Sequence, residues 1–414
     1  MALSAIVVLA AAAAAAPAAP RPAPAAAASA PASAPASAPA SLPASFPPPE
    51  TAPATPAEAV KIDPTVDSGE GPEKHTVEIF GDAVSAAIGA AVQIRLAAAN
   101  EAPGIGISAA RLSLLVRAED LLNLRIFLQL ELNPLANAMV ELPAFLPPNQ
   151  PIFPLADAYL AFDVASPAIG NLGHLRIGQF KVPFGAEPLV EPMDLLVPER
   201  SWALRALSPG RDIGIEYGAD FHGYGIPLAA SVGVFNGSGP NRFQEVGDLL
   251  GAARVWGRIG ATGRAGFSLR YGLSWMMDTR RTDPLTSADD AATVFGADVT
   301  VRYRWLTATV EAILASTDSE RAGFEAVGGY ALAAVQIIPE FLELTARYER
   351  FVPDLAAAAN GGPRPAWRAA GGVNLYYLGE RFRLQYLFTY GDDGTSDTRR
   401  VPGPEHLFLF TLRT

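Results

Sequence analysis

The sequence of 414 residues contains no cysteine, only four histidines, and charged residues at just 18%. The absence of cysteine excludes a disulfide scaffold, a thiolate zinc site and a cysteine nucleophile. Only Lys61, Lys74 and Lys181 are lysines, so arginine supplies almost all of the positive charge. The formal net charge of −11 argues against a nucleic-acid-binding protein, because such a protein needs a basic surface.

Long apolar runs are almost absent as well. The single run, residues 2–19, is short, rich in alanine and interrupted by Pro17. It predicts a signal peptide over residues 1–19, although no lysine or arginine precedes the apolar core. Residues 20–75 are dominated by alanine, proline and serine, which cannot bury a core. This segment is expected to be a disordered tether after export, with neutral low-complexity sequence as the alternative.

From residue 84 onward, apolar and polar residues alternate. In residues 342–349, leucine, alanine and tyrosine alternate with glutamate, threonine and arginine, and the same pattern occurs in residues 123–132, 265–275, 298–305 and 382–390. A helix would need apolar residues three and four positions apart, whereas a strand places every second residue on one face. The pattern therefore predicts strands.

The same alternation predicts about sixteen strands in the rest of the chain. They are expected at residues 84–97, 109–118, 123–133, 156–164, 174–182, 211–219, 227–236, 251–260, 264–276, 295–304, 306–315, 325–337, 340–350, 369–378, 380–390 and 404–413. Short connections follow the even-numbered strands. Long connections follow the odd-numbered strands, as at residues 134–155, 183–210, 277–294 and 351–368.

Short turns at one rim and long loops at the other are typical of an outer-membrane barrel. The expected strands have about ten residues, the length that crosses a bilayer with tilt. A soluble β-sandwich also alternates, but its strands are usually shorter. We therefore expect an all-β fold over residues 76–414, a transmembrane antiparallel β-barrel of about sixteen strands. Its place would be in outer-membrane lipid of a Gram-negative bacterium.

Several motifs of the middle of the chain resemble the phosphate-selective porin O and P family. They are DAYLAF at 157–162, LRIGQFKVPFG at 175–185, ERS at 199–201, SPGRDIGIEYG at 208–218 and GVFNGSG at 233–239. Weaker similarity occurs at 110–132 and 371–386, and the resemblance covers about residues 84–414. The resemblance implies a sixteen-stranded channel that forms homotrimers and folds its third long loop into the lumen. Here the third long connection is 183–210. Phosphate-selective members are expected to have a lysine-rich lumen, and this chain has one lysine beyond residue 75.

The candidate pore-lining residues lie in or beside this loop and on the expected lumen face of the strands. They are Lys181, Glu199, Arg200, Arg205, Arg211, Arg270, Arg302, Arg347 and Arg383. A ring of arginines in a constriction favours anions, and guanidinium binds phosphate through paired hydrogen bonds. Acidic and basic residues nearly balance on the expected lumen face, however. The alternative is that Arg200 with Glu199, and Arg211 with Asp212, form ion pairs that hold the loop.

Signals of enzyme chemistry are weak. No nucleophile elbow or Ser–His–Asp spacing is present, and GDDG at 391–394 fits a turn better than a calcium loop. We therefore expect no enzyme activity, cofactor or metal. The first functional hypothesis is a porin for passive diffusion of small hydrophilic solutes, with anions such as phosphate as one class. The second is a structural barrel that anchors the Pro-rich arm to the cell envelope.

Overall fold

In the computed structural model of this protein, the residues described lie between Thr76 and Arg413. They are 76–78, 84–99, 102–118, 121, 123–132, 155–166, 170–221, 227–242, 249–260, 266–282, 289–317, 324–353, 355, 365–378, 381–392 and 405–413. The expected signal peptide at residues 1–19 and the expected tether at 20–75 lie outside the described residues.

The described strands form one antiparallel sheet. They are β1 (Thr76–Glu78), β2 (Val84–Ala99), β3 (Ala102–Ala118), β4 (Leu124–Leu132), β5 (Leu155–Ser166), β6 (Gly170–Lys181), β7 (Arg211–Asp220), β8 (Leu228–Phe235), β9 (Leu250–Gly260), β10 (Phe267–Thr282), β11 (Asp289–Tyr303), β12 (Leu306–Thr317), β13 (Phe324–Ile338), β14 (Leu342–Val352), β15 (Ala366–Tyr377), β16 (Phe382–Asp392) and β17 (Glu405–Arg413).

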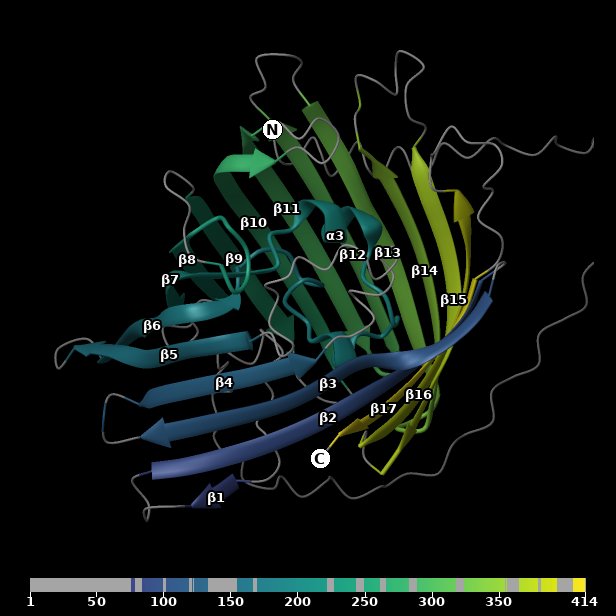
Figure 1. Ribbon diagram of the computed structural model, residues 1–414, viewed down its shortest axis with the longest axis horizontal. Coiled ribbons are helices and arrows are strands. Elements are labelled where there is room, and N and C mark those ends of the chain that lie inside the picture. Colours follow the sequence, from purple (N-terminus) through teal and green to yellow (C-terminus); the bar gives the residue numbers. More distant parts are fainter. Residues whose placement is uncertain are drawn as a thin grey trace, which may run out of the picture. The chain divides into compact units, whose positions relative to one another are not determined.

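Sixteen of these strands, β2 to β17, close into a barrel (Figure 1). Each strand pairs with the one before it, and β17 closes the ring by pairing with β2 from His406↔Ala98 to Arg413↔Ala91. A closed barrel leaves no open sheet edge, which is what a bilayer requires of strands. The predicted fold class and strand number are confirmed.

The short strand β1 was not predicted. Strand β2 extends beyond the end of β17, and β1 pairs with this extension, from Thr76↔Ala87 to Glu78↔Ser85. Three residues are too few to show an alternating pattern, so the sequence carries no strand signal there. The pairing satisfies backbone groups of β2 that β17 does not reach.

The two faces of the barrel have opposite character. On β16, Leu384 and Phe388 point outward and are each 39% exposed. Their neighbours Arg383 and Gln385 point inward and are buried. The same alternation of exposed apolar and buried polar residues runs along β14. On β9 and β17 the buried inward residues include apolar ones, such as Leu250 and Leu407. The outside of the barrel is therefore apolar and the inside is mostly polar, with apolar patches.

Two predicted long connections are wrong. Strands β2 and β3 continue to Ala99 and from Ala102, so the first connection is short. Strands β10 and β11 likewise extend to Thr282 and from Asp289, into the predicted loop 277–294. The last five residues of β10, 278–282, are all polar, so they show no alternation of apolar and polar residues. Strand pairing continues there without the alternation that would reveal it in the sequence.

A β-bulge explains the missed half of β3. Gln93 pairs with Ala109 but the next residue, Ile94, pairs with Ile107, so Ser108 is the extra residue. A bulge shifts the alternation by one position. The apolar pattern therefore changes phase at Ser108, and the predicted strand began only at residue 109.

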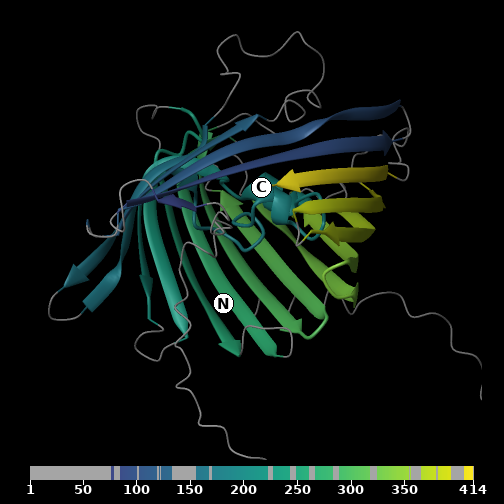
Figure 2. The same ribbon diagram turned by 90° about the horizontal axis from the view of Figure 1, so that it is seen from below.

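The chain between β6 and β7, residues 182–210, lies inside the ring of strands (Figure 2). We call it the inward loop. It contains a 3-10 turn, η2 (Pro192–Asp194), and a short helix, α3 (Trp202–Leu207). No helix in the described part of the chain is long and apolar enough to cross a bilayer.

An apolar core joins the inward loop to the barrel wall. Phe184, Leu204 and Leu207 of the loop pack with wall residues that include Phe180 and Met276. No surface is exposed on Phe180, Phe184 or Met276. Burial of such side chains stabilises the contact by about 1.5–3 kcal/mol each. This core fixes the loop against one side of the interior.

Candidate functional site

The inward loop begins and ends at one point on the barrel wall. The Val182 amide donates a hydrogen bond of 2.9 Å to the Gly210 carbonyl, which closes the base of the loop. Gly210 has a φ of +70°, a left-handed conformation that favours glycine. The loop therefore leaves and rejoins the wall between two neighbouring strands.

One carboxylate of the loop, Glu191, is surrounded by three cations of the wall. It forms ion pairs with Lys181 and Arg111 and lies 3.5 Å from Arg211 Nη2. Burial alone would raise the pKa of Glu191, but Lys181, Arg111 and Arg211 outweigh it and hold that pKa far below its usual value. Arg211 also binds Asp157 of β5. We call these residues the Glu191 cluster.

A second carboxylate, Glu199, joins the loop to strands β2, β14 and β15 of the wall. Arg95 Nη2 of β2 donates to it at 3.0 Å and Arg368 Nη1 of β15 at 2.9 Å. Arg347 of β14 donates to the Glu199 backbone carbonyl. Burial would raise the pKa of Glu199, but the guanidinium groups of Arg368 and Arg95 lower it overall. The negative charge of Glu199 is therefore held in place by strands from both sides of the barrel closure.

A third carboxylate, Glu187, turns back onto the loop itself. Its Oε2 accepts a hydrogen bond of 2.8 Å from the Ser201 amide, and Oε1 lies 3.5 Å from Arg347 Nη1. The amides of Ala186 and Glu187 donate to Glu311 of β12 at 2.7 and 2.9 Å. Burial raises the pKa of Glu187 despite the nearby Arg347. The Ser201 bond cross-links the two halves of the loop, and the bonds to Glu311 attach the loop to the wall.

Backbone carbonyls of the loop accept hydrogen bonds from the wall of β15 and β16. Arg383 donates to Met193 and Leu195, the first at 2.9 Å. Asn374 Nδ2 donates to Leu196 at 2.9 Å. Arg413 of β17 forms an ion pair with Asp194. The loop is thus attached to inward-facing side chains around most of the barrel.

Five of the nine candidate site residues take part in these attachments: Lys181, Glu199, Arg211, Arg347 and Arg383. A sixth, Arg200, donates to the carbonyls of Glu187 and Val190, the latter at 2.6 Å. It therefore supports the turn of the loop.

The alternative prediction paired Arg200 with Glu199 and Arg211 with Asp212, and neither ion pair forms between these described residues. Arg200 binds carbonyls of its own loop and not Glu199. The Asp212 carboxylate accepts hydrogen bonds from the Ile213 and Gly237 amides, both at 2.7 Å. Arg211 binds Asp157 instead. The general idea that these charges hold the loop nevertheless agrees with the geometry.

The other three candidates lie apart from the attachments. Arg205 is exposed on α3. Arg270 of β10 is directly opposite Arg258 of β9, both at inward positions near the rim of short turns. Arg302 is exposed near the end of β11 at the same rim. The structure therefore does not bring the nine candidates into a single ring.

Four arginines that attach the loop are not among the nine candidates, namely Arg95, Arg111, Arg368 and Arg413. Arg111 lies two positions before Ser113 and shares its inward phase on β3, so the alternation could have identified it. Arg368 fell within the predicted connection 351–368, whereas β15 already begins at Ala366. Only residues 366–368 of β15 precede the predicted start at residue 369, and three residues are too few to show an alternating pattern.

Comparison with known proteins gives matches only at the level of fold. No family model matches the sequence, and no curated protein matches it. Among solved structures, a loop-deletion mutant of OmpT, an outer-membrane protein of Vibrio cholerae, has a TM-score of 0.56 at 16% identity, covering 80% of this chain and 100% of that one. The barrel therefore has the same fold as this outer-membrane protein.

Two further solved structures, both of outer-membrane channels, have a similar fold. The anion-selective porin of Comamonas acidovorans has a TM-score of 0.55 at 14% identity, covering 80% of this chain and 99% of that one. The outer-membrane channel DcaP of Acinetobacter baumannii has a TM-score of 0.51 at 12% identity, covering 80% and 97%. At such identities the likeness concerns the fold alone.

Proposed function

We propose that this protein is an outer-membrane porin through which small hydrophilic solutes diffuse passively. The observation that carries the proposal is the inward loop, attached by charged side chains inside a closed barrel with an apolar outer face. Such a loop narrows a lumen and sets its charge, which are the two properties that decide passage. The motifs that resemble the phosphate-selective porin family agree with this role.

We propose further that the channel prefers anions. Arg258 of β9 lies directly opposite Arg270 of β10. Arg302 follows on β11, in register with Ser268. A group of arginines at inward positions near one mouth of a pore favours anions such as phosphate. Lys181 is occupied by Glu191, so the preference would depend on arginine.

The proposed location is the outer membrane, with residues 1–19 as signal peptide and 20–75 as a periplasmic tether. A homotrimer is the proposed assembly, since OmpT of Vibrio cholerae is described in a trimer form. Light scattering of the detergent-solubilised protein would measure the assembly. A monomeric mass would refute it.

The decisive experiment is electrical. Purified protein in planar bilayers should give discrete current steps, and the reversal potential in a potassium chloride gradient should show anion preference. Changing Arg258 and Arg270 together to glutamine should reduce that preference. Arg304→Gln, in the turn between β11 and β12, is the matched control and should leave it unchanged. Cation preference in the unchanged protein would refute the anion proposal, and silent bilayers would refute the channel.

A second candidate function is a structural barrel that anchors the Pro-rich arm. The observation that favours it is the apolar core between loop and wall, where Phe184 has no exposed surface and Leu204 is 1% exposed. Such packing reduces the open area of the lumen. This function predicts no conductance, together with cell-wall cosedimentation that is lost when residues 20–60 are deleted.

A further inference from the structure

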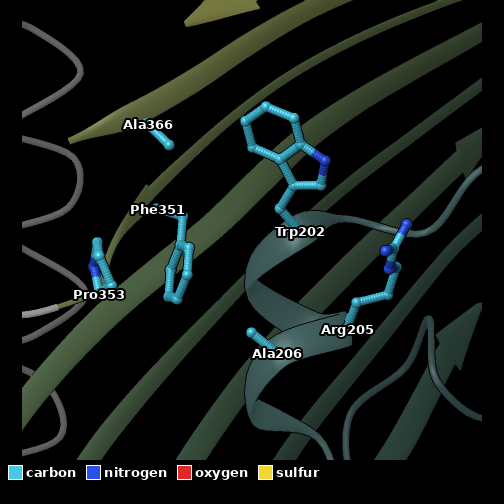
Figure 3. Close-up of a pocket in the computed structure, with 6 residues that line it drawn as sticks. All are labelled: Trp202, Arg205, Ala206, Phe351, Pro353 and Ala366. Carbon is cyan, nitrogen blue, oxygen red and sulfur yellow. The ribbon is translucent and has the colours of Figure 1, made fainter. Parts of the chain in front are cut away.

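A pocket opens between α3 and the wall near the rim of long connections. It is lined by Trp202, Arg205 and Ala206 of the inward loop and by Phe351, Pro353 and Ala366 of the wall (Figure 3). Its volume is about 340 Å³. Strand β14 ends at Val352 and β15 begins at Ala366, so the pocket faces the outer mouth of the proposed channel.

The aromatic walls of the pocket are held in place. Trp202 donates its backbone amide to Glu349 at 2.9 Å, and the guanidinium of Arg368 lies 3.8 Å from the centroid of its ring. A cation at this distance from an indole face is attracted to it. Phe351 of the wall lines another side of the pocket, beside Pro353, and Ala206 lies one turn of α3 after Trp202 (Figure 3). The two rings form a preformed apolar surface.

The cation of the pocket, Arg205, is exposed on α3. Among the residues that the structure describes, no carboxylate or carbonyl receives a hydrogen bond or forms an ion pair with its guanidinium. Arg368, only a few ångströms from the same Trp202 ring, instead binds both Glu199 and Glu349. Arg205 and Trp202 are three positions apart on α3, which places them side by side on one face.

The surroundings leave a positive charge at Arg205. Arg95 and Arg368 share Glu199, and Arg347 contacts Glu187 and Glu349. The carboxylates of this region are therefore already matched by other arginines. Arg205 contributes with the other arginines to the low pKa of Glu199, but no hydrogen bond or ion pair to a described residue holds its guanidinium. Its exposed guanidinium therefore points to a negatively charged ligand.

We propose that this pocket binds small aromatic carboxylates, with the ring against Trp202 and the carboxylate on Arg205. A bare inorganic anion would gain nothing from the aromatic walls. A neutral aromatic compound would leave Arg205 without an acceptor. The role of the pocket as an entry site for solutes depends on the proposed porin function, whereas binding itself does not.

The test is a binding titration of the folded full-length protein in detergent micelles. Benzoate is the probe, benzyl alcohol tests the ring without charge, and inorganic phosphate tests the charge without the ring. Saturation-transfer NMR and calorimetry would measure affinity. Benzoate should bind saturably, and both other compounds should bind at least about tenfold more weakly, because each satisfies only half of the site.

Variants locate the site. Arg205→Gln should weaken benzoate binding roughly tenfold, since it removes one charge-assisted contact. Arg205→Lys should retain part of the affinity. Arg304→Gln changes another exposed arginine, in the turn between β11 and β12, and should retain all of the affinity. Unchanged affinity in Arg205→Gln, or phosphate binding as tightly as benzoate, would overturn the proposal.

Bilayer recordings separate this proposal from the proposed function. A conducting channel whose folded protein binds no benzoate would refute the pocket and leave the porin intact. Benzoate binding by a barrel that carries no current would support the pocket and refute the porin. The two failures are therefore distinguishable.

Discussion

Arg211 binds Asp157 through two hydrogen bonds, from Nε to Oδ1 at 3.0 Å and from Nη2 to Oδ2 at 2.9 Å. The paired geometry joins the first residue of β7 to β5, across the strand β6 that lies between them. Arg211 Nη2 also lies 3.5 Å from Glu191, near the middle of the inward loop. One side chain therefore ties the exit of the loop both to the wall and to the loop itself.

Arg211→Gln should loosen the inward loop. The change leaves Asp157 buried without its cation, and breaking a buried pair costs about 3–5 kcal/mol. We expect faster tryptic cleavage after the exposed Arg205 and a lower denaturant midpoint. The control is Arg413→Gln, whose partner Asp194 is more than one third exposed, so the expected cost is only about 0–1 kcal/mol. Equal cleavage rates in both variants would show that Arg211 does not hold the loop.

Gly328→Ala should displace α3 from the wall without changing any charge. A Cβ at Gly328 of β13 would lie 2.3 Å from the Ala203 Cβ, closer than two carbon atoms can approach. Overpacking of this kind costs about 1–3 kcal/mol. Hydrogen–deuterium exchange over residues 202–207 should therefore accelerate. Gly371→Ala is the control, since nothing lies within 4 Å of the added carbon, and unchanged exchange in Gly328→Ala would place α3 elsewhere.

Glu191→Gln should destabilise the protein at neutral pH but much less in strong acid. The folded pKa of Glu191 is lowered, so its contribution is fully present above the unfolded pKa of about 4.3 and is lost only as pH falls toward the folded value. The stability difference between wild type and variant should stay constant from pH 7 to about 5 and shrink below pH 4. Guanidinium unfolding in lipid vesicles would measure it.

Glu187→Gln provides the opposite pH dependence. Burial raises the folded pKa of Glu187, so its contribution is present at low pH and is lost as pH rises through that folded pKa. The variant should therefore gain stability relative to wild type as pH rises. The measurement is the difference in free energy of unfolding between wild type and variant, followed against pH. If this difference changed with pH in the same direction for Glu187→Gln and Glu191→Gln, the environments of the two carboxylates would not differ.

The strands could be predicted from the sequence because each must face lipid on one side and a polar interior on the other. Strand β16 was expected at 380–390 and extends from Phe382 to Asp392. The prediction failed where this constraint is absent or interrupted. Beyond the apolar band, as in β10 up to Thr282, and at the bulge of Ser108, pairing continues but the alternation does not.

The attachments of the inward loop could not be predicted in the same way. The partners of Arg200 and Arg383 are backbone carbonyls, which every residue has and which leave no signal in the sequence. The partner of Arg211 is Asp157, 54 positions away, rather than the adjacent Asp212. Which charges meet depends on the path of the loop, and that path depends on the apolar core around Phe184.

Phe410→Asp should prevent assembly of the barrel. Phe410 points outward from the last strand and packs against Phe382 of β16, with ring centroids 4.3 Å apart. A carboxylate there would replace an apolar contact on the lipid face and weaken the pairing that closes the ring. The folded fraction is measured by heat-modifiable migration of outer-membrane extracts. Leu412→Phe, two positions further on the same face, should assemble normally, and normal levels of folded Phe410→Asp would show that the outward register is wrong.

Phe388→Arg and Leu384→Arg should differ in their cost, although both side chains are 39% exposed on the outer face of β16. Phe388 lies near the middle of the strand, whereas Leu384 lies two residues from its start at Phe382, beside the short turn. The free-energy cost of an arginine on the lipid face is about 2–4 kcal/mol at the bilayer midplane and falls to about 0–1 kcal/mol near the interface. Phe388→Arg should therefore lower the free energy of unfolding by the larger amount, measured by guanidinium titration in lipid vesicles. The inward Thr389 provides a third position, because Thr389→Arg would face the lumen and avoid the lipid penalty. Equal costs for Phe388→Arg and Leu384→Arg would mean that the apolar band is not centred on the strands.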